Sequence, residues 1–162
     1  MVNKKDQIIT QKTLKDLSVY IVGCGSIGRR HTEVLKSLGI KDIRIYDNDF
    51  KKMESLLVEF PDIKTCNTFE DGLKEKPDAV FILTPTKLHL EMIRKSVQNG
   101  CHVFSEKPIS DSIEGIDELT YRPIKGSFEE IISYLKDNHE DEFESYIENS
   151  VEVDTSITVS LC

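Results

Sequence analysis

A glycine string at residues 23–28, Gly-Cys-Gly-Ser-Ile-Gly, constrains the fold of this chain more than any other feature. A short apolar run, residues 17–22, leads into it, and apolar side chains recur with helical spacing from residue 27 to residue 38. This order predicts a buried strand, a tight turn and a helix. Residues 40–46 alternate between apolar and polar side chains, which predicts a second strand after the helix.

The alternation of helices and strands continues along the chain. Helices are predicted over 51–59, 69–76 and 88–98, and strands over 63–66, 79–83 and 101–105. Five strands that alternate with helices indicate right-handed crossovers and therefore an α/β fold with a doubly wound parallel sheet. Beyond residue 108 the regularity weakens, and the pattern predicts a helix over 110–119, a connector over 121–126, a bent acidic helix over 128–147 and a lone strand over 151–161.

The three glycines of the string suit a dinucleotide, because each has a separate physical role. Gly23 permits the tight turn, Gly25 lets the backbone approach a pyrophosphate, and Gly28 lets the helix lie close to the strand. Free amides at the helix start, including those of Ser26 and Ile27, and the positive end of the helix dipole would bind the phosphates. The alternative is that the glycines only form a turn.

An acidic residue follows the second predicted strand. Asp47 lies 19 residues beyond Gly28, the spacing at which a carboxylate meets the adenosine ribose in this kind of motif. Its charge would repel a 2′-phosphate, so NAD is favoured over NADP. Two alternatives stay open, since Asp47 could simply cap a loop and Asp49 lies close enough to take the ribose role.

Two further polar groups follow the fourth and fifth predicted strands. Thr84-Pro85-Thr86 comes directly after the fourth strand, and His89 follows it. In a doubly wound sheet the ligand lies at the carboxyl ends of the strands, where these residues would face a cofactor. The pattern fits equally well a proline turn in which a threonine caps the next helix and His89 lies on the helix surface.

The fifth strand ends in Ser105-Glu106-Lys107-Pro108. A lysine at such a strand end could hold a hydroxyl or carbonyl oxygen by charge and hydrogen bond, with Glu106 tuning it and Pro108 constraining the turn. By itself, a Glu-Lys pair is more commonly a solvated loop pair.

Three segments together resemble the N-terminal domain of the Gfo/Idh/MocA oxidoreductase family, which includes glucose-fructose oxidoreductase and inositol 2-dehydrogenase. They read VGCGSIGRRH, IYDND and FILTPTKLHLEMIRKSVQNGCHVFSEKPIS, and the resemblance covers about residues 17–120. The combination of G-x-G-x-x-G-x-x-H, T-P-x-x-x-H and E-K-P at these spacings is specific to that family. The resemblance implies a Rossmann NAD(P)-binding fold, with pyrophosphate on the glycines and the ribose on Asp47.

The resemblance also implies the residues at the reacting end of the cofactor. Thr84, Pro85 and His89 would line the nicotinamide side, while Glu106 and Lys107 would contact the nicotinamide ribose and the substrate. In the family, the E-K-P lysine helps to orient the hydroxyl group that loses its proton and hydride, so Lys107 is the expected catalytic residue. The implied reaction is hydride transfer between nicotinamide and a sugar-like or cyclitol-like alcohol.

The chain departs from the family after Pro108. Family enzymes have a second α/β domain, which carries an acid-base histidine in a G-G-x-x-x-D-x-x-x-H type motif, and nothing after Pro108 matches that motif. His139 has no preceding glycine pair and is expected to be a solvated helix residue. The alternative function is therefore a non-catalytic dinucleotide-binding module that lacks the substrate domain.

Charge divides the 162 residues unevenly. Residues 1–125 hold 20 Lys or Arg and 19 Asp or Glu, whereas residues 126–162 hold one Lys and ten acids. We therefore predict an N-terminal arm at 1–16, a dinucleotide-binding domain at 17–120 and an acidic, helical C-terminal extension at 121–162. The absence of a basic excess in residues 1–125 argues against a nucleic-acid partner. The apolar residues of the extension could cover a sheet face or form a homo-oligomer contact.

The remaining features concern compartment and metal binding. No apolar run reaches the roughly 18 residues that a membrane span needs, and a cytoplasmic protein without a membrane partner is expected. The four cysteines lie far apart with no C-x-x-C pair, which favours free thiols over disulfides or a zinc site, and no metal site is expected.

Overall fold

The computed structural model describes residues 14–111 and the backbone of a short strand at 160–161. The strands are β1 (Ser18–Val22), β2 (Asp42–Tyr46), β3 (Lys64–Thr65), β4 (Ala79–Ile82), β5 (His102–Ser105) and β6 (Ser160–Leu161). The α-helices are α2 (Ser26–Ser37), α3 (Phe50–Glu59), α4 (Phe69–Lys74) and α5 (His89–Gln98), and the 3-10 turns are η1 (Leu14–Asp16) and η2 (Thr86–Leu88).

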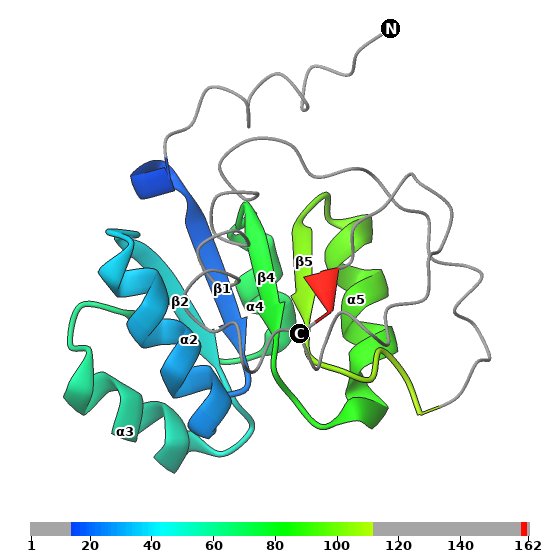
Figure 1. Cartoon of the computed structure of the whole chain (residues 1–162), viewed down its shortest axis with the longest axis horizontal. Helices are drawn as coiled ribbons and strands as arrows, with labels where there is room; N and C mark the ends of the chain where they lie inside the picture. Colours follow the sequence, from blue (N-terminus) through cyan, green and yellow to red (C-terminus); the bar gives the residue numbers. More distant parts are fainter. Residues whose placement is uncertain (1–13, 112–159, 162) are drawn as a thin grey trace, which may run out of the picture.

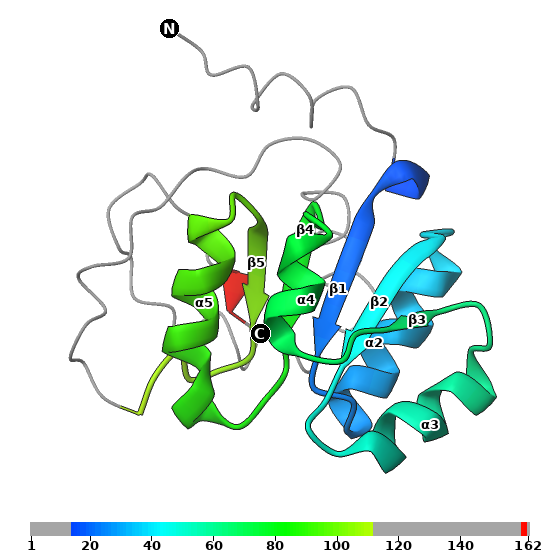
Figure 2. The same ribbon diagram turned by 180° about the vertical axis from the view of Figure 1, so that it is seen from behind.

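All six strands form one parallel sheet in the order β3-β2-β1-β4-β5-β6, with helices on both faces (Figures 1 and 2). The chain crosses from one half of the sheet to the other between β3 and β4, so β1 and β4 lie side by side at the centre. This arrangement confirms the predicted doubly wound α/β fold.

Alternation along the central strands explains why helices cover both faces. Val19 and Ile21 of β1 pack in one apolar cluster with residues of α2 and α3, whereas Tyr20 and Val22 pack in a second cluster with residues of α4 and α5. These four side chains of β1 are fully buried. A central strand covered on both sides therefore has apolar residues at successive positions, as the sequence shows.

The structure corrects the prediction for the end of the chain. Residues 151–161 predict a lone strand, but Ser160 and Leu161 pair in parallel with Phe104 and Ser105 and make a sixth strand. Without β6, β5 would be an edge strand whose backbone groups lack a ladder partner on one side. A local pattern cannot show which edge a distant segment joins, so this pairing was not predicted.

Several predicted segments lie outside the described residues. They are the arm up to residue 13, most of the helix at 110–119, the connector at 121–126, the acidic helix at 128–147 with His139, and residues 151–159. Among the described residues, no helix has the length and apolar character needed to cross a membrane.

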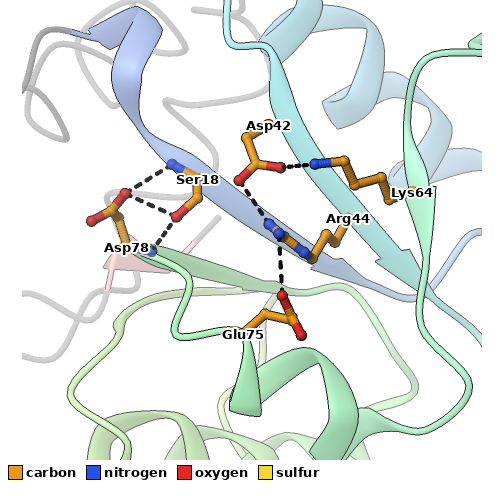
Figure 3. A network of polar contacts seen from close by, with 6 residues as sticks. All are labelled: Ser18, Asp42, Arg44, Lys64, Glu75 and Asp78. Carbon is orange, nitrogen blue, oxygen red and sulfur yellow. Dashed lines mark hydrogen bonds and ion pairs between the residues drawn. The ribbon is translucent and has the colours of Figure 1, made fainter.

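The amino ends of the strands carry a polar network (Figure 3). Asp78 accepts hydrogen bonds from the backbone and hydroxyl of Ser18, at 2.8 and 2.9 Å. Asp42 accepts from Lys64 at 2.9 Å and from Arg44 at 2.7 Å. Partial burial opposes ionisation of Asp42, but the hydrogen bonds from Lys64 and Arg44 outweigh it and lower the pKa of the carboxyl group. This network lies at the amino edge of the sheet, whereas the predicted site residues follow the carboxyl ends of the strands.

Candidate functional site

The predicted site residues meet because four strands end side by side. Tyr46 and Ile82 are the register partners of Val22, and Ser105 is the partner of Ile82. The ladder continues one step past these strands, with the Gly23 amide donating to the Tyr46 carbonyl at 2.8 Å and the Glu106 amide donating to the Ile82 carbonyl at 3.0 Å. The segments that begin at Gly23, Asp47, Leu83 and Glu106 therefore leave the sheet at one edge.

The first and last glycines of the turn both occupy positions that exclude a side chain. Gly23 has φ of +105°, and a Cβ atom there would lie 2.5 Å from the Leu83 carbonyl oxygen. A Cβ atom on Gly28 would lie 2.0 Å from the Gly23 carbonyl oxygen but 3.9 Å from the Ile21 side chain of β1, so the turn requires glycine here, and not the predicted close approach of the helix to the strand. Both positions accept only glycine.

Gly25 differs, because a Cβ atom at this position would meet no protein atom within 4 Å. Gly25 is the N-cap of α2 and has an ordinary φ of −73°, and it has no side chain to cap the helix. The first amides of the helix, those of Ser26 and Ile27, lack intrahelical partners because of their position. Open space beside these amides at the positive end of a helix suits a pyrophosphate group.

Asp47 is bound to the glycine turn. One carboxylate oxygen accepts a hydrogen bond from the Cys24 amide at 2.8 Å, and the other accepts from the Asp49 amide at 2.8 Å. Asp47 is 9% exposed, and the Lys52 ammonium lies 3.9 Å from its carboxylate. Each carboxylate oxygen can accept more than one hydrogen bond, so Asp47 retains acceptor capacity for a ribose hydroxyl.

Asp49 has a different role in the structure. Its carboxylate accepts a hydrogen bond from the Lys51 amide at 3.1 Å and caps α3. Beside it, a groove of about 390 Å³ runs between the glycine turn and α3. Arg29, Lys51 and Lys52 supply positive charge to this groove, and Arg29 pairs with Glu59 at 2.6 Å.

The Cys24 side chain is buried within the turn. Burial, and then the negative charge of Asp47, raise the pKa of the thiol to about 12. The thiol is therefore protonated at neutral pH and is a poor nucleophile.

His89 lies between the segments that follow β4 and β5. It is 1% exposed, so the reading of His89 as a helix-surface residue is wrong. Its Nδ1 lies 2.9 Å from the Pro108 carbonyl oxygen and its Nε2 lies 2.6 Å from the Thr84 carbonyl oxygen. The sequence places His89 at this edge but does not show that both ring nitrogens meet protein carbonyl groups.

Glu106 lies close to His31, a residue to which the sequence analysis assigned no role. Its Oε1 lies 3.6 Å from Nε2 of His31, and His31 is 8% exposed. The His31 ring packs edge-on against Phe104, with 5.1 Å between ring centroids. The G-x-G-x-x-G-x-x-H motif contained a signal for this contact. Its histidine, His31, lies three residues after Gly28 and therefore on the same face of α2 as that glycine.

Comparisons with known proteins identify the family to which the fold belongs. Residues 17–122 match the family described as an oxidoreductase family with an NAD-binding Rossmann fold, Gfo/Idh/MocA. The UDP-N-acetylglucosamine 3-dehydrogenase of Acidithiobacillus ferrooxidans is 29% identical over 102 residues, which are 61% of this chain and 31% of that protein.

Two solved structures are similar at higher identity. Myo-inositol 2-dehydrogenase from Lactobacillus plantarum has a TM-score of 0.58 and 31% identity, over 63% of this chain and 31% of that chain. Scyllo-inositol dehydrogenase from Lactobacillus casei, solved with NAD(H) and scyllo-inositol, also has a TM-score of 0.58 and 31% identity, over 66% of this chain and 32% of that chain.

The chain spans about a third of the length of the curated relatives it matches, since the aligned part is 31% of each of the first two. Within that part, the family match covers the glycine turn and every strand end of the site. The chain therefore belongs to the Gfo/Idh/MocA oxidoreductase family and carries its NAD-binding Rossmann fold.

Proposed function

We propose that this chain binds NAD(H) across the carboxyl edge of its sheet, with the pyrophosphate on the glycine turn. The observation that carries the proposal is the open space at Gly25, beside the amides of Ser26 and Ile27. The pyrophosphate would approach the backbone there, and Asp47 would accept hydrogen bonds from the adenosine ribose while still holding the Cys24 amide.

The segments after β4 and β5 would take the nicotinamide half. Thr84 and Pro85 would line the ring, and Glu106 and Lys107 would contact the nicotinamide ribose and the substrate. When bound, NAD supplies the hydride acceptor for oxidation of an alcohol. The Lys107 ammonium would hold the substrate hydroxyl by charge and hydrogen bond and keep its carbon in position for hydride transfer.

A sugar or cyclitol is the proposed class of substrate. The support comes from the similar proteins, which include a nucleotide-sugar dehydrogenase and two inositol dehydrogenases. Such polyols present several hydroxyl groups, which a charged side chain such as Lys107 can bind in a definite orientation.

Replacement of Gly25 by valine tests the cofactor site. A Cβ atom at residue 25 would meet no protein atom within 4 Å and the φ angle is ordinary, so the Gly25→Val variant should fold, with a loss of about 1 kcal/mol in the free energy of unfolding because valine is a poor N-cap residue. Its Cβ and methyl groups would fill the space proposed for the pyrophosphate, so NADH affinity should fall by about 100-fold or more, equivalent to about 2.7 kcal/mol. The measurement is NADH titration followed by fluorescence.

Val58→Ala is the matched control, because Val58 is 87% exposed on the far part of α3. This variant should bind NADH like the wild type. If Gly25→Val folds and binds NADH with unchanged affinity, the pyrophosphate does not lie at the glycine turn and the proposal fails.

The acidic extension has two predicted roles, covering the sheet or self-association. The described part of it, β6, pairs with β5 at the edge of the sheet, whereas the apolar residues on which both predicted roles depend lie outside the described residues. Sedimentation of the full chain over a range of concentrations separates them, since a concentration-dependent rise in mass is expected only for self-association.

A further inference from the structure

His89 joins two segments that leave the sheet from neighbouring strands. It is the first residue of α5 and is 1% exposed. Its Nε2 contacts the carbonyl group of Thr84, just after β4, and its Nδ1 contacts the carbonyl group of Pro108, just after β5. One imidazole ring therefore cross-links the segments that carry Pro85 and Lys107.

The two contacts require two donors. A carbonyl oxygen only accepts hydrogen bonds, whereas a neutral imidazole has one N–H donor and one nitrogen with a lone pair. A lone pair that faces a carbonyl oxygen at 2.6 or 2.9 Å is repelled by it. Both contacts are favourable only when each ring nitrogen carries a proton, and the positive charge then strengthens both bonds.

The surroundings of the His89 ring contain two backbone acceptors and several charged side chains on the neighbouring segments. Charged side chains on η2, on α5 and in the segment after β5 are Lys87, Glu91, Arg94, Lys95, Glu106, Lys107 and Asp111. The two hydrogen bonds of the ring go to backbone carbonyl groups rather than to these side chains. Glu91 forms an ion pair with Lys95 at 2.8 Å, and Glu106 lies 3.6 Å from His31.

We propose that His89 is a positioning residue that carries both ring protons and holds the Thr84 and Pro108 carbonyl groups together. Through the Pro108 carbonyl it holds Lys107, the preceding residue, at a constant distance from the segment that begins at Thr84. This inference rests on the proposed function for the identity of the ligand, but the ring protons belong to the folded chain itself. Because its ring nitrogens are occupied, His89 acts through the backbone and not by contact with the cofactor.

Nitrogen NMR of the full chain with isotope-labelled histidine tests the proton count directly. The His89 ring should show two protonated nitrogens at neutral pH, each coupled to a hydrogen that exchanges slowly with water. His89→Gln assigns the signals. If this variant does not fold, variants that replace His31, His102 and His139 in turn assign them by elimination. An unprotonated nitrogen in the His89 ring overturns the proposal.

Ligand affinities test the positioning role. ADP lacks both the nicotinamide and the ribose attached to it, so its affinity reports on the glycine turn and Asp47 alone. In His89→Gln, ADP affinity should stay within about twofold of wild type, while NADH affinity should fall by about fivefold to tenfold, the effect of losing one hydrogen bond. His102→Gln, at the amino end of β5, is the matched control and should change neither affinity.

The outcomes separate the two proposals. Equal losses for ADP and NADH in His89→Gln would show general disruption and overturn the positioning role, as would unchanged NADH affinity. If the wild-type chain binds neither ligand, the proposed function fails, and the nitrogen signals alone then decide the proton count of His89.

Discussion

The carboxylate of Asp47 accepts a hydrogen bond at 2.8 Å from the backbone amide of Cys24, which ties the end of β2 to the middle of the glycine turn. The same carboxylate accepts from the Asp49 amide, so one side chain organises both segments. A residue expected to bind ribose therefore also holds the turn in the conformation that a pyrophosphate would need. Its two roles are separable by experiment, because one concerns stability and the other cofactor choice.

Asp47→Ser should lower both stability and the preference for NAD over NADP. The shorter hydroxyl cannot satisfy both the buried Cys24 amide and the partly buried Asp49 amide, so the free energy of unfolding should fall by about 1–3 kcal/mol. Removal of the negative charge should also narrow the difference between the NADH and NADPH dissociation constants. Chemical denaturation and the two titrations measure these effects.

Asp49→Ser is the control for this change. Asp49 caps α3, and serine is also a good N-cap residue, so stability should change by less than about 0.5 kcal/mol and cofactor preference should stay as in the wild type. If Asp49→Ser narrows the preference and Asp47→Ser does not, the ribose role belongs to Asp49.

Lys107→Ala should remove turnover and weaken cofactor binding much less. A polyol and aldose screen, followed through NADH absorbance, identifies a substrate. Loss of the ammonium group should then lower kcat by about 100-fold or more, while NADH affinity should fall by about tenfold at most, the effect of losing one contact to the nicotinamide ribose. Lys87→Ala in η2 is the control and should retain wild-type turnover. Cofactor binding without turnover by any tested polyol would favour the non-catalytic module.

His31 and Glu106 should be energetically coupled. They lie 3.6 Å apart, and their side chains are only 11% and 17% exposed. In a double-mutant cycle with His31→Gln and Glu106→Gln, the coupling in the free energy of NADH binding should be at least about 0.5 kcal/mol. Additive effects of the two substitutions would show that the contact does not hold Glu106 for the cofactor.

Gly72→Ala should destabilise the fold at a place remote from the cofactor site. A Cβ atom at residue 72 would lie 2.1 Å from the Tyr20 ring, which is fully buried between β1 and α4. We expect the free energy of unfolding to fall by about 1–3 kcal/mol, as in other overpacked cores. Adding Tyr20→Leu should recover part of this loss, and a denaturation series on the three variants measures it.

Alkaline pH should destabilise the chain partly through Cys24. Its thiol pKa is raised from 9.0 to about 12 in the folded chain, so between these values the unfolded chain loses the proton first. The contribution of Cys24 to stability is therefore present below pH 9.0 and declines as pH rises toward 12. Cys24→Ala should lose less stability than the wild type between pH 9.0 and pH 11, measured by urea denaturation; an equal loss would exclude the effect.

Local spacing was sufficient to predict the strand–turn–helix order, the glycine turn and the strand ends that carry Asp47, Thr84 and Lys107. It was sufficient because periodicity and glycine conformation depend on neighbouring residues, and parallel strands bring their carboxyl ends to one edge. The roles of the predicted residues toward NAD and substrate stay predictions. The family match supports the fold and the cofactor class.

The tertiary structure alone decided which polar groups meet across that edge. His31 reaches Glu106, His89 lies between the Thr84 and Pro108 carbonyl groups, and residues 160–161 join β5. These contacts link residues that are distant in sequence or on different elements, and they depend on strand register and helix placement. A single sequence therefore specifies the cofactor-binding fold, whereas the partners of its buried histidines emerge only when the sheet is assembled, since a buried polar group bonds to whatever acceptor the packing brings near it.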